Sequence, residues 1–369
     1  MTNRRAPKYR LICDALKTEL ADGKYGSRKV LPSEVSLSRR FKTGRSTVKR
    51  ALECLRGEGL IRSQQGRGTF VTRLGASRKI GLIVPGMGGS EFFPAMVSEI
   101  ARVIRERGYM ILMADFSKER DETLVRDVKA FARSLIDENV QGVIYQPLEF
   151  VKSAADRNRE IVDIFTSAGV PVVLMINDLD VPPHRSSFDL VGINNAKAGR
   201  RLAEHLMSVG ARNVHLVLRP NSGSAHADRL AGLMQALAFA GGGRRRYGVL
   251  VADPGDVGAL RRHLRKGRCP DAFICGSDTQ AGVFRQTLEK VGLRVGRDVL
   301  LAGFNDLQIA KMLTPPLTTV RQPCADIAKA VFDTLMARVT NPDRPPQEVL
   351  LDAPLIVRES TQWTERRSR

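Results

Sequence analysis

The spacing of hydrophobic residues changes near residue 80 of this chain. Before that point they recur every three or four positions, as Tyr9, Ile12, Leu16 and Leu20 do, which predicts amphipathic helices. From Ile80 onward, short runs that are apolar throughout alternate with helical stretches. Fully apolar strands separated by helices are typical of a parallel sheet covered on both faces. The pattern therefore predicts a small helical domain followed by a larger α/β domain.

The first domain has the element order of a helix-turn-helix with a hairpin behind it. Ser33 can cap the second helix, and Val35, Leu37 and Phe41 are predicted to face inward. The predicted elements are helices over 7–22, from 33 onward and over 45–58, a turn at 43–44, and a hairpin of 60–62 with 69–71. This is the plan of a winged helix-turn-helix, which places its second motif helix in the major groove of duplex DNA.

The charge distribution points to the same partner. The chain carries a net charge of +20, and its first 75 residues contain 18 Lys and Arg against 6 Asp and Glu. Basic side chains placed on phosphates release condensed counterions, so this excess favours a polyanion as the partner of the first domain.

The second domain contains too many strands for one parallel sheet of ordinary size. Its apolar runs cover 80–84, 109–114, 142–145, 171–176, 214–218, 272–275 and 299–304, and helices are predicted over 94–107, 121–139, 196–209, 229–239 and 279–291. Two α/β lobes account for this number, and a ligand would bind between them at the carboxyl ends of the strands. We expect a DNA-binding domain over 1–75, a linker over 76–79 and an α/β domain over 80–369.

The residues predict neither an enzyme nor a cofactor-binding or metal-binding protein. There is no Walker A loop, no GxSxG and no HExxH, and the five histidines are dispersed. The five cysteines form no CxxC and no cluster at zinc spacing, and they are predicted to be core residues in a reducing cytoplasm. The basic N-terminus lacks the apolar run of a signal peptide, and no segment approaches the length of a membrane span.

Four motifs give the first domain a family resemblance. LPSE (31–34), RSTVKRAL (45–52), EGLI (58–61) and QGRGTFV (65–71) together resemble the GntR family of bacterial transcription regulators. The resemblance implies that Arg45 is the main base reader and that Thr47 and Lys49 contact bases or phosphates. Gly66 would let the wing approach the minor groove. The other candidate DNA contacts are Ser33, Ser46, Arg50, Gln65 and Arg67.

The second domain resembles the effector domain of LacI/GalR regulators, which is similar to type I periplasmic binding proteins. The resemblance rests on residues 191–210, 228–237, 275–306 and 314–323. It implies a sugar site with Phe92 and Phe93 as walls and Arg229 as the main donor. The other implied effector contacts are Asn177, Asp278, Asn305 and Gln322. A GntR head on such a domain resembles regulators of the arabinose-repressor type.

Ile176-Asn177 and Asn305 make the predicted cleft less acidic than is common in this family, which leaves a phosphorylated or acidic ligand open beside a sugar. The expectation is a cytoplasmic, homodimeric repressor that binds a palindromic operator and is switched by a small molecule, without a cofactor. One alternative is a regulator whose second domain only dimerises. A head fused to an aminotransferase-like enzyme would need more residues, and a binding protein that feeds transport would need export.

Overall fold

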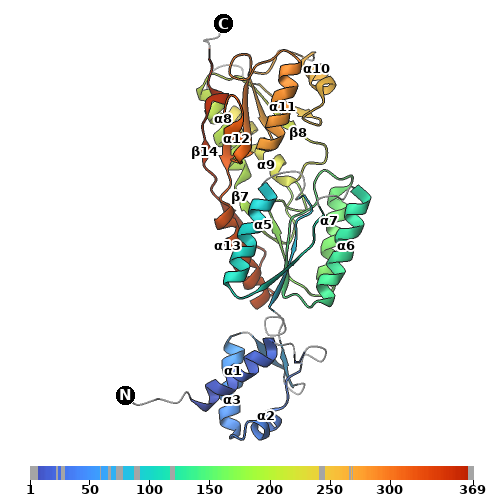
Figure 1. Cartoon of the computed structure of the whole chain (residues 1–369), viewed down its shortest axis with the longest axis vertical. Helices are drawn as coiled ribbons and strands as arrows, with labels where there is room; N and C mark the ends of the chain where they lie inside the picture. The colour runs from blue at the N-terminus through green and yellow to red at the C-terminus, as the bar shows by residue number, and fades with distance from the viewer. Residues whose placement is uncertain are drawn as a thin grey trace, which may run out of the picture.

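The structure is a computed structural model of the whole chain. It describes residues 7–21, 24–25, 30–58, 60–64, 68–71, 78–86, 92–116, 121–240, 246–265, 267 and 269–364. Figure 1 shows three bodies in a row: a small helical head, an α/β lobe next to it, and a second α/β lobe at the far end. We call them the head, the N lobe and the C lobe.

Within its described residues, the head contains three helices and a two-stranded wing. Its elements are α1 (Lys8–Ala21), α2 (Glu34–Arg40), α3 (Arg45–Gly57), β1 (Ile61–Gln64) and β2 (Gly68–Val71). β1 pairs antiparallel with β2, and Leu16, Leu37 and Leu55 are buried in the core that the helices share. The prediction for Val35 was wrong: this side chain is 36% exposed, because the short helix α2 turns only one narrow face, marked by Leu37, toward α3.

The N lobe contains a six-stranded sheet of order β13-β7-β6-β5-β3-β4, in which all the pairs are parallel. Its strands are β3 (Lys79–Ile83), β4 (Met110–Met113), β5 (Gly142–Tyr145), β6 (Val172–Met175), β7 (Asp189–Ile193) and β13 (Glu348–Leu351). Helices α5 (Phe92–Glu106) and α13 (Cys324–Thr340) pack together on one face, and α6 (Asp121–Asp137) and α7 (Ala154–Ser167) cover the other. β3 begins at Lys79, the last residue of the expected linker.

The C lobe contains a second six-stranded sheet, of order β14-β12-β11-β10-β8-β9. Its strands are β8 (Asn213–Leu218), β9 (Arg246–Val251), β10 (Ala272–Cys275), β11 (Leu300–Asn305), β12 (Thr318–Arg321) and the antiparallel β14 (Leu355–Ile356). Its helices are α8 (Asn195–Ser208), α9 (Ser224–Phe239), α10 (Val257–Arg265), α11 (Asp278–Lys290), α12 (Gln308–Met312) and the 3₁₀ turn η2 (Glu359–Thr361).

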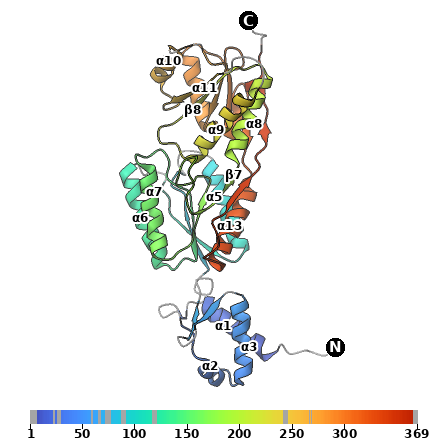
Figure 2. The ribbon, with the colours of Figure 1, turned by 180° about the vertical axis from the view of Figure 1, so that it is seen from behind.

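Helices α8 and α9 lie unusually close together, and Figure 2 shows them alongside each other. Glycines make this approach possible, because a Cβ on Gly199 would lie 2.3 Å from the carbonyl oxygen of Arg229, and one on Gly232 would lie 1.9 Å from that of Ala196. The packing fixes the position of α9 and therefore places Arg229, which α9 carries, at the cavity between the lobes.

The chain crosses between the lobes three times. It passes from β7 to α8, returns from β12 to α13, and crosses again from β13 to β14. Two of these segments are joined by hydrogen bonds, from the Asn194 amide to the Leu351 carbonyl (2.9 Å) and from Arg201 to the Ala353 carbonyl (2.7 Å). The predicted two-lobed α/β fold behind a winged helix-turn-helix is confirmed.

Candidate functional site

The first candidate site is the exposed N-terminal turn of α3. Arg45 and Ser46 are exposed there and Thr47 is half-buried, whereas Val48 is fully buried and fixes which side of the helix faces outward. Gly44 caps the helix without a side-chain hydrogen bond, so the backbone N–H groups of the first turn are not covered by a capping side chain. A helix end of this kind, with a guanidinium beside it, attracts phosphate and base acceptors.

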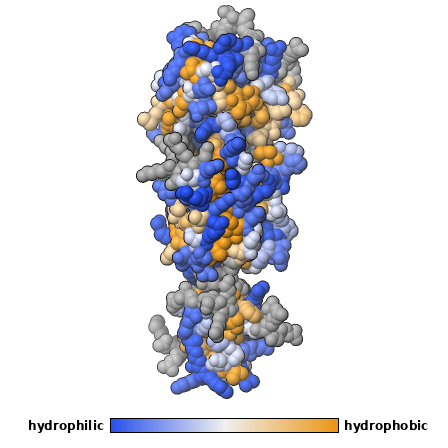
Figure 3. All heavy atoms as spheres, turned by 90° about the vertical axis from the view of Figure 1, so that its right-hand side faces the viewer, coloured by the Kyte–Doolittle hydropathy of each residue, from blue (hydrophilic) through white to orange (hydrophobic). Residues whose placement is uncertain are grey.

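Three further candidates surround that turn. Lys49 is exposed, and the Arg50 guanidinium lies 4.5 Å from the ring centroid of Tyr9, so α1 positions this cation. Ser33 is exposed and caps α2 by accepting a hydrogen bond from the Ser36 amide (3.3 Å). Figure 3 shows many hydrophilic residues at the end of the head that lies farthest from the lobes. The wing candidates Gln65, Gly66 and Arg67 lie outside the described residues.

The second candidate site is a cavity of about 330 Å³ between the two lobes. It lies at the carboxyl ends of the parallel strands, where α/β folds bind ligands. Five of the predicted effector residues come together directly around it: Phe92 and Phe93 at the start of α5, Asn177 after β6, Arg229 on α9, and Asn305 at the end of β11. Gln322, on the segment that leads back to the N lobe, lines the cavity as well.

Arg229 is the best-buried cation of this cavity, with 4% of its surface exposed. Its Nε donates to Asn195 Oδ1 and one terminal nitrogen donates to the Gly276 carbonyl, both at 2.8 Å, while the guanidinium lies 3.9 Å from the ring centroid of Phe304. Burial lowers the pKa of Arg229 to about 10, against the opposing pull of nearby carboxylates such as Glu149. The group is held rigidly, and it remains charged at neutral pH.

Four amide side chains of the cavity have unused hydrogen-bonding capacity. Gln146, Asn177, Gln280 and Gln322 each bury one polar amide atom that has no partner among the described residues. Buried polar atoms normally have partners, so unpaired atoms that converge on one cavity indicate a polar occupant. Hydrogen bonds made by the other amide atom fix the orientation of two of these side chains. The Asn177 side-chain oxygen accepts from the Ala225 amide (2.9 Å), and the Gln322 side-chain nitrogen donates to Asn305 Oδ1 (2.7 Å).

Apolar side chains and turned strand ends shape the rest of the cavity. Phe92 and Phe93 pack edge to face with centroids 5.2 Å apart. Ile176 and Asn305 have φ values of +70° and +111°, which are rare for residues other than glycine. Such conformations cost free energy and often mark functional sites, and here they redirect the chain where β6 and β11 end at the cleft.

The structure does not support Asp278 as an effector contact. This residue is fully buried at the start of α11, and it is not among the residues that line the cavity. Its two carboxylate oxygens accept from the Leu307 amide (2.8 Å) and the Thr319 hydroxyl (2.6 Å), and burial raises its pKa to about 7. The adjacent Ser277 caps the helix. Asp278 therefore holds the loop after β11 against α11.

Sequence reasoning missed several residues that line the cavity: Gln146, Glu149, Phe150, Arg219, His226 and Gln280. Two of them could have been found, because Gln146 directly follows β5 and Arg219 directly follows β8, and strand ends face the cleft. His226 lies in the first turn of α9, whose start was predicted five residues too late, at 229 instead of Ser224.

Glu149 and its neighbours bridge the lobes beside the cavity. Its Oε1 accepts from the Gly223 amide (3.0 Å) and lies 3.4 Å from His226 Nδ1. Burial raises the pKa of Glu149, but His226, the Gly223 amide and Arg229 outweigh it and hold the pKa below its usual range. Next to it, the Phe150 amide donates to the Asn221 carbonyl (2.8 Å), and the Arg219 guanidinium lies 4.2 Å from the Phe150 ring centroid.

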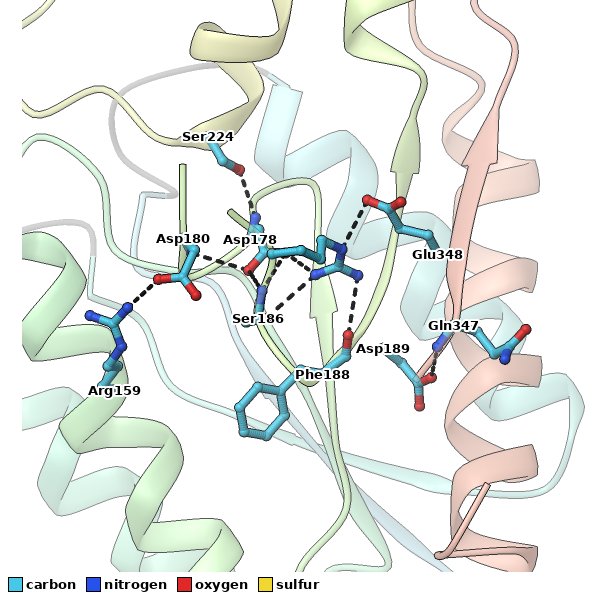
Figure 4. Close-up of polar contacts among 10 residues, drawn as sticks. Arg159, Asp178, Asp180, Ser186, Phe188, Asp189, Ser224, Gln347 and Glu348 are labelled. Atoms are coloured by element: carbon cyan, nitrogen blue, oxygen red, sulfur yellow. Dashed lines mark hydrogen bonds and ion pairs between the residues drawn. The ribbon is translucent and has the colours of Figure 1, made fainter. Parts of the chain in front are cut away.

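The loop after β6 forms a second bridge, which Figure 4 shows in detail. The Asp178 amide donates to the hydroxyl of Ser224 at the start of α9 (2.7 Å), and the Asp178 carboxylate accepts from the Ser186 amide (3.2 Å) and pairs with Arg185. Arg185 also pairs with Glu348 on β13 (2.9 Å). Two consecutive residues, Asn177 and Asp178, thus tie the N lobe to the helix that carries Arg229.

Comparison with known proteins agrees with the two kinds of domain. Residues 8–71 match the model of the bacterial regulatory proteins of the gntR family, and residues 203–361 match a periplasmic binding protein-like domain. The HTH-type transcriptional regulator CelR of Thermobifida fusca is 28% identical over 324 residues, covering 86% of this chain and 89% of that protein. The arabinose metabolism transcriptional repressor of Geobacillus stearothermophilus is 25% identical over 384 residues, covering 98% and 99%.

A solved structure shares the whole architecture. The structure of a CelR–cellobiose complex has a TM-score of 0.65 and 22% identity, and it covers 96% of this chain and 100% of that one. The chain is a DNA-binding transcription regulator and not an enzyme. It joins a GntR-type head to a LacI-like sensor related to periplasmic binding proteins, as the motifs predicted. In the described residues, no helix is long and apolar enough to span a membrane.

Proposed function

We propose that this regulator is a repressor that binds a palindromic operator as a homodimer and responds to a neutral sugar in the cavity between its lobes. The observation that carries the sugar proposal is the set of unpaired, buried amide atoms of Gln146, Asn177, Gln280 and Gln322. Hydroxyl groups both donate and accept, so a polyol can satisfy amide oxygens and amide nitrogens alike. Phe92 and Phe93 offer an apolar wall to the C–H face of a sugar ring.

The positions of the charged groups in the cavity, more than their net charge, favour a neutral sugar over a phosphorylated one. Two nitrogens of Arg229 already donate hydrogen bonds to protein oxygens. The pKa of the Glu149 carboxyl lies below its usual range, so this side chain adds a negative charge to the cavity. The Arg219 guanidinium stacks on Phe150. A phosphate would face the carboxylate of Glu149, and burial would leave that repulsion poorly screened.

The relatives support this ligand class. One related structure is a complex of CelR with cellobiose, and other relatives are named arabinose and ribose repressors. The DNA half of the proposal rests on Arg45, Ser46, Thr47, Lys49 and Arg50 of α3. Ser33 and the wing residues Gln65, Gly66 and Arg67 complete the proposed contact surface. Because the protein acts on chromosomal DNA, the proposal places it in the cytoplasm.

Coupling between the two sites would pass through the three crossing segments. A ligand that favours one relative orientation of the lobes changes the spacing of the two heads in a dimer. The ligand can shift operator affinity by no more than the difference between its own binding free energies for the two lobe orientations. Such coupling is typically about 1–3 kcal/mol, which is 5- to 150-fold in affinity. Two heads on one operator also bind far more tightly than one, so dimerisation multiplies the effect.

Titration calorimetry tests the ligand class. The experiment compares neutral monosaccharides and disaccharides with their phosphates. It uses the wild type and the variants Arg229→Ala and Arg126→Ala. The last variant is the matched control, since Arg126 is 73% exposed on α6. We expect a neutral sugar to bind the wild type and the control but not Arg229→Ala. If no sugar binds, the sensor only dimerises; if phosphates bind more tightly, the proposed ligand class is wrong.

A further inference from the structure

A cluster of two thiols and a carboxylate lies between α1 and α3 of the head, away from both sites above. Cys13 on α1 is buried, Cys54 on α3 is half-buried, and Glu58 is the exposed residue that caps α3. Their ligand atoms, two Sγ and one carboxylate oxygen, all lie within 4.8 Å of one another. Cys13 is far from Cys54 and Glu58 in the sequence, so spacing motifs do not reveal this cluster.

The geometry of the cluster suits a tetrahedral metal ion. The Cys54 Sγ lies 3.6 Å from Glu58 Oε1. In a tetrahedral zinc site, bonds of about 2.3 Å to sulfur and about 2.0 Å to oxygen place the two ligand atoms about 3.5 Å apart. Cys54 and Glu58 are one helical turn apart, so the backbone of α3 already holds this ligand pair at the required separation.

The surroundings allow such an ion to enter. Glu58 has a side-chain exposure of 42%, so its side of the cluster is open to solvent and leaves the fourth position for water. The carboxylate now contacts Lys17 Nζ at 2.6 Å, and Lys17 itself is 36% exposed. Lys17 contacts Oε1, the oxygen that also faces Cys54 Sγ. A surface ion pair of this kind contributes little to stability, so Lys17 can move away or shift to the second carboxylate oxygen when an ion binds.

We propose that Cys13, Cys54 and Glu58 form a site for a borderline-soft divalent metal ion, of which Zn²⁺ is the type, with water as the fourth ligand. Two thiolates and a carboxylate suit Zn²⁺ better than Mg²⁺ or Ca²⁺, which prefer all-oxygen sites. The ion would join α1 to the C-terminal end of α3, opposite the turn that carries Arg45. It would therefore stabilise the head without blocking its DNA-reading end.

Co²⁺ titration of the full-length protein under reducing, anaerobic conditions tests the proposal. Thiolate ligation gives a sulfur-to-cobalt charge-transfer band, which we expect in the wild type at one equivalent. Cys54→Ser should lose the band and bind more than about 100-fold more weakly, because losing a ligand costs more than losing an outer-sphere partner. Cys324→Ser is the matched control, since Cys324 is half-buried in the sensor, and it should keep the band.

Two further readouts keep the test decisive. Glu58→Gln should retain the band with affinity reduced at least about tenfold, and circular dichroism establishes that each variant is folded. Zn²⁺ should raise the melting temperature of the wild type and of Cys324→Ser, but not that of Cys54→Ser. A folded, reduced wild type without the band overturns the proposal. A band that survives in Cys54→Ser places the metal elsewhere and overturns it as well.

Discussion

Glu149 and His226 face each other across the cleft, one from each lobe, with Oε1 of the carboxylate 3.4 Å from Nδ1 of the imidazole. Glu149 follows β5 in the N lobe, and His226 lies in the first turn of α9 in the C lobe. Both side chains are 11% exposed and both line the cavity. The contact exists only when the lobes are close, so we expect it to stabilise the closed arrangement that holds a ligand in the cavity.

Glu149→Gln should therefore weaken effector binding. The side-chain oxygen of the introduced glutamine can still accept a hydrogen bond from the Gly223 backbone amide. The substitution removes the negative charge that faces His226. Losing one charged hydrogen-bonding partner costs about 1–3 kcal/mol, so we expect effector affinity to fall about 5- to 150-fold. Calorimetry measures this, and Glu138→Gln is the control, because Glu138 lies exposed just after the end of α6. Unchanged affinity in Glu149→Gln would show that the pair does not contribute to closure.

Arg45→Ala should reduce specific DNA binding by about 1–3 kcal/mol, because it removes the proposed bidentate contact with guanine. The side chain is exposed in the first turn of α3, so the head should remain folded. Fluorescence anisotropy with a site selected from a random DNA pool measures the effect. Arg126→Ala removes the same charge from α6 of the N lobe and should leave DNA binding unchanged. Equal losses in both variants would mean that net charge alone drives binding.

Gly232→Ala should destabilise the sensor by about 3 kcal/mol or more, because the added methyl group meets backbone and the close packing of α8 and α9 must open. The new Cβ would lie 1.9 Å from the Ala196 carbonyl oxygen and 2.8 Å from the Arg200 amide. Gly57→Ala at the end of α3 meets nothing within 4 Å and should be neutral or stabilising by up to about 1 kcal/mol. Urea unfolding compares the two. A stable Gly232→Ala protein would contradict the close approach of the helices.

Asp278 should make the sensor less stable as the pH rises towards neutrality. Burial raises the pKa of this carboxyl from 3.8 to about 7 in the folded state. The folded protein therefore binds more protons than the unfolded chain between these values, and stability falls as pH rises through this window. Relative to Asp278→Asn, the wild type should lose up to about 4 kcal/mol of unfolding free energy between pH 4 and pH 7. Parallel pH curves for the two proteins would show that the carboxyl is not perturbed.

The sequence predicted β3, β5, β6, β8, β10 and β11 because they read as unbroken apolar runs. It missed β9 and β13, which lie at sheet edges and carry exposed residues such as Tyr247 and Leu350. It also missed the short β14 and two internal strands, β7 and β12, whose runs contain Asp189, Gly192 and Thr318 among the apolar residues. The predicted helices also did not include α7, α10, α12 and α13. The first turn of α13 follows the crossing from β12, so this helix could not be assigned to the N lobe without the sheet order.

The residues implied by the family resemblance mostly line the cavity, whereas the strand-end residues Gln146 and Arg219 and the contacts that form where the lobes meet were missed. Arg229 lines the cavity as expected, although its helix begins earlier than predicted. Glu149 and His226 form their contact only through the relative position of the lobes, which no local pattern encodes. Asp278 was assigned to the effector because the family resemblance implied it, but at the start of α11 its carboxylate faces the loop after β11.

The most direct test of the central claim measures operator affinity by anisotropy with and without the sugar that calorimetry identifies. For the wild type, the sugar should change the affinity about 5- to 150-fold, the usual range of coupling between two sites. Arg229→Ala should bind the operator as tightly as the sugar-free wild type and should not respond to the sugar. A wild type whose operator affinity ignores bound sugar, or an Arg229→Ala protein that responds fully, would contradict the account.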